Sequence, residues 1–209
     1  LTVTDAVGET ASASATITVN PLPTISISPT SSTIDVGQSV TFTNTTSYGT
    51  TPYVWTYTVS PSTGFTQVGN EFTFTTAGTY TVTLTVTDAV GETASASATI
   101  TVNTALTPTI TASSPIDLGQ SSTVTLGISG GTSPYTWTFE MNGSTANLTS
   151  LGFKLGANTL TPLYTGKYTL YFNVTDSASN AVTKEVTATI TVNTALTPTI
   201  TASSPIDLG

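Results

Sequence analysis

The chain has 209 residues, of which only 7% are charged, and its net charge of -8 comes from 11 acidic and three basic residues. So few cations cannot neutralise a phosphate backbone or an anionic bilayer, and we therefore exclude nucleic acid and anionic membrane surfaces as partners. The absence of Cys and His excludes disulfides, thiol nucleophiles, zinc sites of the usual kinds and imidazole bases.

Motifs for catalysis and for membrane insertion are also absent. The chain has no apolar run of about eighteen residues and no charged leader, so we predict neither a membrane span nor a signal peptide in this segment. It has no phosphate-binding loop, nucleophile elbow or metal-ligand spacing. We expect no catalytic residue, no cofactor and no metal, and predict that the protein is not an enzyme.

The first twenty residues introduce an internal repeat. Residues 1–20 return without a substitution at 84–103, and residues 194–209 repeat 104–119. Two long copies share ordered landmarks, including Ile34-Asp-Val-Gly-Gln and Ile116-Asp-Leu-Gly-Gln. Each copy spans about 85 to 90 residues, enough for a core of its own.

These repeats predict four segments. Residues 1–20 are the C-terminal part of a preceding repeat, 21–103 a first-type repeat, 104–193 a second-type repeat, and 194–209 the N-terminal part of a following repeat. We interpret the chain as a window onto a longer tandem array. The alternative is a short subunit that polymerises by donor-strand complementation, in which neighbouring subunits complete the partial ends.

In chain order, short apolar and hydroxyl-rich runs predict strands at residues 24–28, 39–43, 53–59 and 71–75. Residues 80–88 then alternate apolar and hydroxyl side chains, which points Tyr80, Val82, Leu84 and Val86 inward. Residues 94–102 keep this period after a hairpin turn at 88–91. Without helical periodicity, the pattern predicts an all-β fold of antiparallel sandwiches with about seven strands each.

Aromatic residues occupy matching places in the two copies. Trp55 and Trp137 lie in a mid-domain strand, where we expect both to be core residues of an immunoglobulin-like sandwich. Tyr80 and Tyr168 begin a late strand, the position of a tyrosine corner.

The stretch Gly78-Thr-Tyr-Thr-Val-Thr-Leu-Thr-Val-Thr-Asp-Ala-Val-Gly resembles the closing strands of PKD-type immunoglobulin-like domains. Gly131-Thr-Ser-Pro-Tyr-Thr-Trp-Thr-Phe resembles related repeats of bacterial and archaeal surface proteins. After each Trp the chain departs from the Trp-x-Phe-Gly-Asp-Gly pattern frequent in the PKD family. The resemblance implies extracellular spacers, stalks and adhesion modules at a cell surface, here of archaeal type.

The connections between copies are short, contain Pro and lack Gly, as in residues 101–109. Such linkers extend a chain and stiffen it. We therefore predict a structural, extracellular cell-surface protein, a stiff stalk or filament whose partners are neighbouring copies and laterally associated chains. The alternative is an adhesin or carbohydrate-binding module in which Tyr48, Phe65 or Tyr164 stacks on sugars.

Four Asn-x-Ser/Thr sequons make N-linked glycans expected partners of this glycoprotein candidate. Strand parity points Asn173 to solvent, Asn142 and Asn147 lie in a polar loop, and Asn44 shares the inward parity of Phe42.

Acidic residues recur at turns in matching positions, namely Asp35, Asp117 and Asp207, and again Asp5, Asp88 and Asp176. We predict that they accept hydrogen bonds from the local backbone. A calcium ion beside Asp88 and Glu92 would need six to eight oxygens, and the sequence shows no such cluster. With three basic residues there are few ion pairs to lose in acid, so we also expect acid tolerance.

Overall fold

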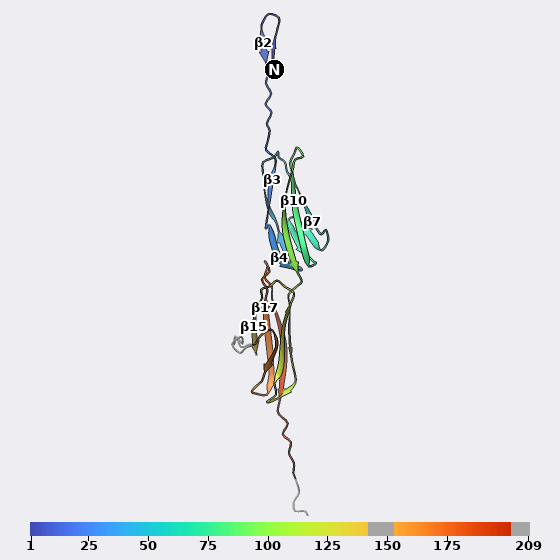
Figure 1. The fold of residues 1–209 in the computed structure, drawn as a ribbon, viewed down its shortest axis with the longest axis vertical. Coiled ribbons are helices and arrows are strands. Elements are labelled where there is room, and N and C mark those ends of the chain that lie inside the picture. Colours follow the sequence, from blue (N-terminus) through green and yellow to red (C-terminus); the bar gives the residue numbers. More distant parts are fainter. Residues whose placement is uncertain (142–152, 202–209) are drawn as a thin grey trace, which may run out of the picture. The chain divides into compact units, whose positions relative to one another are not determined.

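The computed structural model describes residues 1–141 and 153–201. These residues form strands and turns (Figure 1), and none of their segments is a helix long and apolar enough to cross a membrane. The chain divides into two compact units. They comprise Leu1–Ser31, Thr41–Thr63 and Tyr80–Thr99 in the first, and Ser32–Val40, Gly64–Thr79 and Ile100–Gly209 in the second.

Residues 1–20 contain an isolated hairpin of two short strands, β1 (Thr2–Thr4) and β2 (Thr10–Ser12). Its apolar side chains are open to solvent, with Leu1 88% exposed and Val19 87% exposed. The identical residues at 84–103 lie in long strands, where Leu84 is fully buried and Val102 is 3% exposed. Burial of this segment therefore depends on the strands around it.

Residues 21–103 form nine strands in three sheets, ordered β4-β11-β10-β7, β5-β9-β8 and β3-β6. Alternation builds one of the two longest strands, β10, in which Tyr80, Val82, Leu84 and Val86 are buried, as predicted. The strands are β3 (Thr24–Ser28), β4 (Ser31–Asp35), β5 (Ser39–Thr41), β6 (Thr43–Ser47), β7 (Val54–Ser60), β8 (Phe65–Val68), β9 (Glu71–Phe74), β10 (Gly78–Thr87) and β11 (Thr93–Asn103).

Residues 104–193 form a sandwich of two sheets, ordered β12-β14-β16 and β13-β18-β17-β15. Strand β13 runs parallel to β18, whereas β17 runs antiparallel to β15 and β18. The strands are β12 (Thr107–Ala112), β13 (Ile116–Asp117), β14 (Ser122–Ser129), β15 (Thr136–Met141), β16 (Gly156–Leu160), β17 (Gly166–Thr175) and β18 (Thr183–Asn193).

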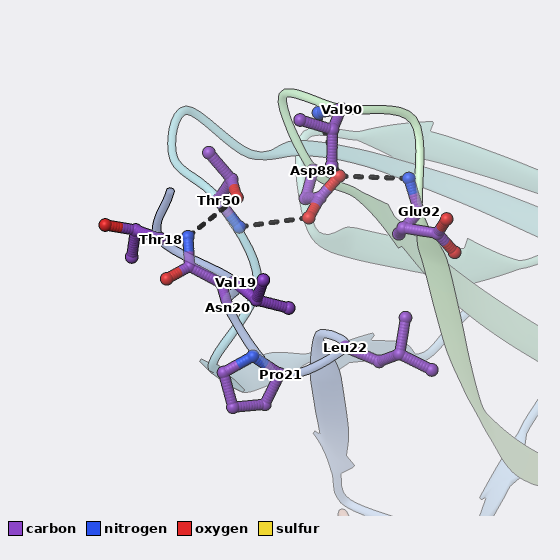
Figure 2. Close-up of a pocket in the computed structure, with 9 residues that line it drawn as sticks. All are labelled: Thr18, Val19, Asn20, Pro21, Leu22, Thr50, Asp88, Val90 and Glu92. Carbon is purple, nitrogen blue, oxygen red and sulfur yellow. Dashed lines mark hydrogen bonds between the residues drawn. The ribbon is translucent and has the colours of Figure 1, made fainter. Parts of the chain in front are cut away.

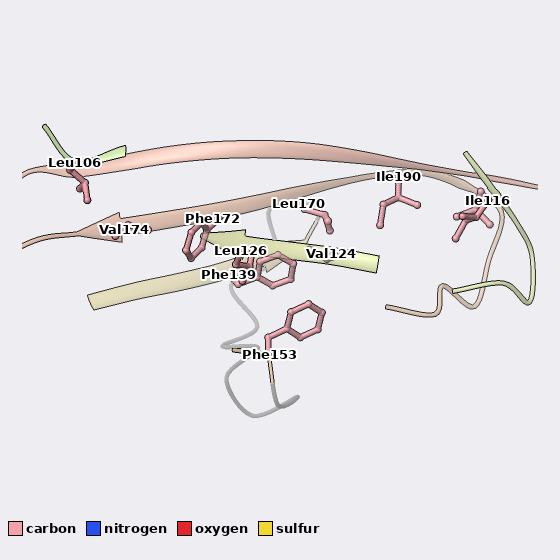
Figure 3. Packing of buried hydrophobic residues seen from close by; sticks show 11 residues of the cluster. Leu106, Ile116, Val124, Leu126, Phe139, Phe153, Leu170, Phe172, Val174 and Ile190 are labelled. Atoms are coloured by element: carbon pink, nitrogen blue, oxygen red, sulfur yellow. The ribbon is translucent and has the colours of Figure 1, made fainter. Parts of the chain in front are cut away.

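The core of this second sandwich is aliphatic with an aromatic centre. Figure 3 shows Leu126, Phe139 and Phe172 grouped between the strands, and each is at most 1% exposed. Phe153 stacks on Phe139 with ring centroids 4.6 Å apart. The all-β, immunoglobulin-like class predicted from the sequence is confirmed, while the boundaries at residues 20, 103 and 193 stay predictions.

The two tryptophans differ in burial. Trp137 packs against the core and meets Phe172 edge to face at 5.9 Å, as expected for a core residue. Trp55 is 47% exposed, so its prediction as a core residue was wrong. Leu84 takes the place of Phe172 in the first repeat, and Trp55 instead donates its indole N–H to Thr46 Oγ1 at 3.0 Å.

A tyrosine corner is present in the second repeat. The Tyr168 hydroxyl donates to the Tyr164 carbonyl oxygen at 2.8 Å, four residues back along the chain. This confirms the prediction for Tyr168. Tyr80, its counterpart, is 2% exposed.

Candidate functional site

The turn that joins β10 to β11 is built around one carboxylate. Asp88 Oδ1 accepts hydrogen bonds from the amides of Val90 at 3.0 Å and Glu92 at 2.9 Å, and Gly91 supplies the left-handed conformation that the turn needs. Asp5 forms the same two bonds in the isolated hairpin. The prediction that these acidic residues accept from the local backbone is confirmed for both.

The second oxygen of Asp88 holds a neighbouring loop. Asp88 Oδ2 accepts from the amide of Thr50 at 3.0 Å, and Thr50 Oγ1 accepts from Asn20 Nδ2 at 2.9 Å. Figure 2 shows Asp88 between the Thr50 and Glu92 amides, with Asn20 on the far side of Thr50. The backbone adds a bond from the Gly49 amide to the Pro21 carbonyl oxygen at 2.9 Å. We call this set the Asn–Thr–Asp contact.

The Asn–Thr–Asp contact recurs in the second unit. Asn103 Nδ2 donates to Thr132 Oγ1 at 2.8 Å, and the Gly131 amide donates to the Thr104 carbonyl oxygen at 2.6 Å. Asp176 takes the part of Asp88 in the turn, with Oδ1 accepting from the Val182 amide at 2.8 Å, but its Oδ2 does not repeat the bond that joins Asp88 Oδ2 to the Thr50 amide. The contact therefore joins the end of one repeat in the sequence to the loops of the next, and does so twice.

In the second unit the contact contains a second carboxyl, that of Asp35. Its Oδ1 accepts from the Thr132 hydroxyl at 3.0 Å, and Asp35 and Asp176 are 2% and 5% exposed. Oδ2 of each carboxyl is buried, and among the described residues only the other carboxyl of this pair is available to it as a hydrogen-bond partner. The prediction of a local backbone acceptor was wrong for Asp35, because its carboxyl meets another repeat.

The two carboxyls are electrostatically unlike. Burial, followed by the hydrogen bond to Asp176, raises the pKa of Asp35 to about 6, although Thr132 and the charge of Lys184 oppose the shift. Burial also disfavours the ionised form of Asp176, but the hydrogen bond from Asp35 and several backbone amides lower its pKa overall. One proton shared by the pair, carried by Asp35, accounts for both directions.

Further polar bonds surround the pair. Gln38 Nε2 donates to the Asn180 carbonyl oxygen at 2.6 Å, and Asn180 Nδ2 donates to the Ser39 carbonyl oxygen at 3.3 Å. The Ser179 amide donates to the Thr33 carbonyl oxygen at 2.7 Å. The residues around Asp35 thus form a polar interface between segment 32–40 and the loop at 177–182.

This arrangement holds chain segments together through hydrogen bonds between protein groups. Within residues 1–141 and 153–201, no three acidic side chains gather as a cation site would require. The sequence exposed the recurrence of Asp88 and Asp176 but missed their Asn and Thr partners. The signal was available, because Asn recurs at the predicted end of each repeat, at 20, 103 and 193.

The aromatic candidates for sugar stacking separate into two kinds. Phe65 is half-buried against Phe72 and Phe74, with centroids 6.0 and 6.2 Å away, so it packs in a core. Tyr48 is 62% exposed and Tyr164 is 75% exposed. Tyr164 also lines an apolar pocket of about 300 Å³, together with Met141, Leu160, Thr161, Pro162, Leu163 and Tyr168.

The sequons differ from their expected order. Asn44 is exposed, so its inward parity was wrong; the strand breaks at Phe42, where the chain leaves the β5-β9-β8 sheet to pair with β3. Asn173 is half-buried on β17, where it pairs with Thr138 and Glu185. Asn142 and Asn147 lie outside the described residues.

Comparison with solved structures gives the same fold. The N-terminal eight Ig domains of Down syndrome cell adhesion molecule match over 88% of this chain at 16% identity and a TM-score of 0.53. This chain spans 30% of that structure's length. Domains 3–5 of Drosophila OTK match over 82% of this chain and 62% of theirs, at 12% identity and a TM-score of 0.47.

A three-domain titin fragment matches over 83% of this chain and 67% of its own length, at 17% identity and a TM-score of 0.43. No curated relative matches the chain. Residues 20–104 match the PKD domain family. This match identifies residues 20–104 as a PKD-type domain, and the match to the tandem Ig domains of Down syndrome cell adhesion molecule shows the same immunoglobulin-like fold for the chain.

Proposed function

We propose that this chain is part of an extracellular structural protein, a stiff stalk or filament at the cell surface whose length is set by its number of repeats. The observation that carries the proposal is the recurrence of the Asn–Thr–Asp contact. Its central bond measures 2.9 Å from Asn20 to Thr50 and 2.8 Å from Asn103 to Thr132. A contact made in the same way at successive repeats sets a fixed geometry from copy to copy, as a stiff array requires.

The linkers support this proposal. Pro21 follows Asn20, and Pro108 follows Asn103 by five residues, so the backbone between copies has few free torsions. The backbone bonds from Gly49 and Gly131 to the linker fix the same place from the loop side. A flexible spacer would have Gly and Ser where this chain has Pro and Thr.

The test is the length of engineered arrays. Residues 21–193 would be joined into arrays of increasing copy number and imaged by electron microscopy. We expect the mean end-to-end distance to rise in proportion to copy number, because stiff junctions add a fixed length per copy. In a flexible chain the distance would instead rise roughly with the square root of copy number. A variant array with Thr132→Val is the matched control, which we expect to bend at every second junction. Square-root growth in the parent array would overturn the proposal.

Two further functions have an observation in their favour. The exposed Tyr164, beside an apolar pocket of about 300 Å³, favours an adhesin or carbohydrate-binding role. Binding of the intact chain to a glycan array, lost in Tyr164→Ala, would support it. The exposed apolar residues of the β1–β2 hairpin favour donor-strand polymerisation. Cryo-electron imaging of native material separates the two assemblies, since only donor strands leave a chain break at each junction.

N-linked glycans are part of the proposal for the cell surface. Its exposure makes Asn44 a better acceptor than the half-buried Asn173. Glycopeptide mass spectrometry of material from the source would show the modified residue, and an Asn44→Gln variant would lose that mass.

A further inference from the structure

The end of the second repeat reproduces the turn that carries Asp35. The Asp35 amide donates to Gln38 Oε1 at 2.9 Å and the Asp117 amide to Gln120 Oε1 at 2.8 Å. The reverse bonds, from the Gln amide to the Asp carbonyl oxygen, measure 3.0 and 2.9 Å. Two turns with the same internal bonds present their carboxyl groups in the same way.

Both turns are also fixed to the last strand of their repeat. The Val36 amide donates to the Asn103 carbonyl oxygen at 2.9 Å, and the Leu118 amide to the Asn193 carbonyl oxygen at 2.9 Å. The side chain of Asn193 therefore lies beside the Asp117 turn, as Asn103 lies beside the Asp35 turn. The side chains of Asn103 and Asp35 are the two groups that bind Thr132.

The two ends differ in what covers them. Asp35 is buried and Asn103 is half-buried, whereas Asp117 is half-buried and Asn193 is exposed. Val36 is half-buried, whereas Leu118 is 39% exposed. The second end thus has the same turn and strand end as the first, and its residues are more exposed.

The linker indicates the partner. Residues 190–209 have the same twenty letters as residues 100–119, which lead from Asn103 into the second-type repeat. The segment that follows Asn193 therefore begins another second-type repeat, whose loops are those that contain Thr132 and Asp176. Thr132 of the resident copy binds an Asp and an Asn placed in this way, so the same loop of the next copy is the complementary partner.

We propose that the end of the second repeat formed by Asp117, Gln120 and Asn193 is a docking surface for another copy of residues 104–193. It binds the Thr132 and Asp176 loops of that copy as Asp35 and Asn103 bind them in the resident copy. This inference rests on the proposed function, because it extends the same contact to the next repeat.

The experiment uses the full chain with residues 120–193 appended after Gly209, which completes another second-type copy. Since the chain has no Cys, a Cys pair reports one contact without background. The test pair is Gln120→Cys with Asn180→Cys in the appended copy. The reference pair is Gln38→Cys with Asn180→Cys in the resident copy, where the two residues are joined by a 2.6 Å bond. A short bifunctional maleimide links each pair, and the rate is followed by mass spectrometry.

We expect the test pair to react within about threefold of the reference rate, and Asp117→Ala to slow it by about tenfold, since tethering alone leaves only a millimolar effective concentration. Glu185→Ala, an exposed acidic residue on β18, is the matched control and leaves the rate unchanged. Asn193→Ala gives a second break of the contact if the first variant melts early.

The outcomes separate the two proposals. A fast reference pair with a slow test pair, or with a test pair indifferent to both Asp117→Ala and Asn193→Ala, overturns this inference and leaves the proposed function standing. A slow reference pair would show that the contact beside Asp35 does not form in solution, and the proposed function then fails along with the inference.

Discussion

Thr132 is the residue on which the contact in the second unit converges. Its hydroxyl accepts from Asn103 and donates to Asp35, and the side chain is 8% exposed. Thr50, its counterpart, is half-buried and accepts one side-chain bond, from Asn20. Thr132 therefore makes two side-chain hydrogen bonds where Thr50 makes one.

We expect Thr132→Val to lower the free energy of unfolding by about 1–3 kcal/mol, because it leaves the buried carboxyl of Asp35 and the half-buried side-chain amide of Asn103 short of a partner. Thr50→Val is the matched variant and should lose less than about 1 kcal/mol, since water replaces the hydroxyl at Asn20. Urea denaturation followed by Trp137 fluorescence, in a Trp55→Phe background, measures the first variant. Equal losses at the two positions would contradict the role of Asp35.

Asp35 should make stability depend on pH in an unusual direction. Its pKa is raised from the ordinary value of 3.8 to about 6, so the folded chain binds this proton more tightly than the unfolded chain. Its contribution is complete below about pH 3.8 and is lost as pH rises through about 6. We expect Asp35→Asn to gain stability relative to the parent between pH 4 and 7.

Asp88→Asn is the opposite control for this measurement. Backbone amides, that of Thr50 first, lower the pKa of Asp88 despite its burial, so its contribution is present at neutral pH and is lost as pH falls through the folded pKa. Denaturation at several pH values should give slopes of opposite sign for the two variants. Slopes of the same sign would refute the shared proton at Asp35.

Tyr48 and Gly130 occupy one backbone conformation in the two repeats, with φ of 63° and 62°. A Cβ at Gly130 would overlap the Ala105 carbonyl oxygen, whereas Tyr48 has an open, 62% exposed side chain. We expect Tyr48→Gly to stabilise the chain by about 0.5–1 kcal/mol through relief of strain, and Gly130→Ala to destabilise it more than that. Thermal melts of both variants test this pair, and a large loss in Tyr48→Gly would disprove it.

At the scale of elements, the tyrosine corner fastens β17 to the loop before it. Tyr168→Phe keeps the ring and removes the 2.8 Å bond to the Tyr164 carbonyl oxygen. We expect a loss of about 1 kcal/mol, the usual net value of one hydrogen bond. Tyr171→Phe, on the same strand with opposite parity, provides the comparison; an equal loss there would assign the effect to the strand instead of the corner.

Alternation in the sequence predicted the strands that are long and half-buried, and failed where partners from distant residues decide. Strands β10 and β11 were found because Tyr80 to Val86 and Ala98 to Val102 repeat every second residue. Strands β4 and β8 are short and carry no such run. The parity of Asn44 failed because a change of sheet at Phe42 leaves no mark in the pattern of apolar residues.

The candidate site was predictable only in part for a related reason. The turn bonds of Asp88 lie within four residues, so local sequence implies them. The bond from Thr132 to Asp35 joins residues 97 positions apart, and its 3.0 Å geometry exists only once two repeats are folded. Repeat alignment located Asp35, but no local pattern indicates what a turn carboxyl meets in the next copy.

For the whole molecule, the composition predicts acid tolerance. Three basic residues leave few ion pairs for acid to break, and Asp35 is already favoured in its protonated form. We expect melting temperatures at about pH 2 and pH 7 to differ by less than about 10 °C, which corresponds to a change of a few kcal/mol at most. A collapse of the low-pH melting temperature would show that carboxylates such as Asp88 dominate stability.

One amino-acid sequence occurs in two structural environments, in the isolated hairpin at residues 1–12 and in the long strands at 84–103. The turn is the same in both, because the backbone amides of Asp5 and Asp88 donate hydrogen bonds of 2.9 Å to the carbonyl oxygens of Glu9 and Glu92. The strand that follows the turn has three residues in the first case and eleven in the second. The turn is formed by hydrogen bonds within a few residues, whereas the long strand pairing forms only where neighbouring strands are present. On a ribosome, each copy would thus receive its closing hairpin last and already bent, so that completion of one repeat leaves a finished surface waiting for the next to emerge.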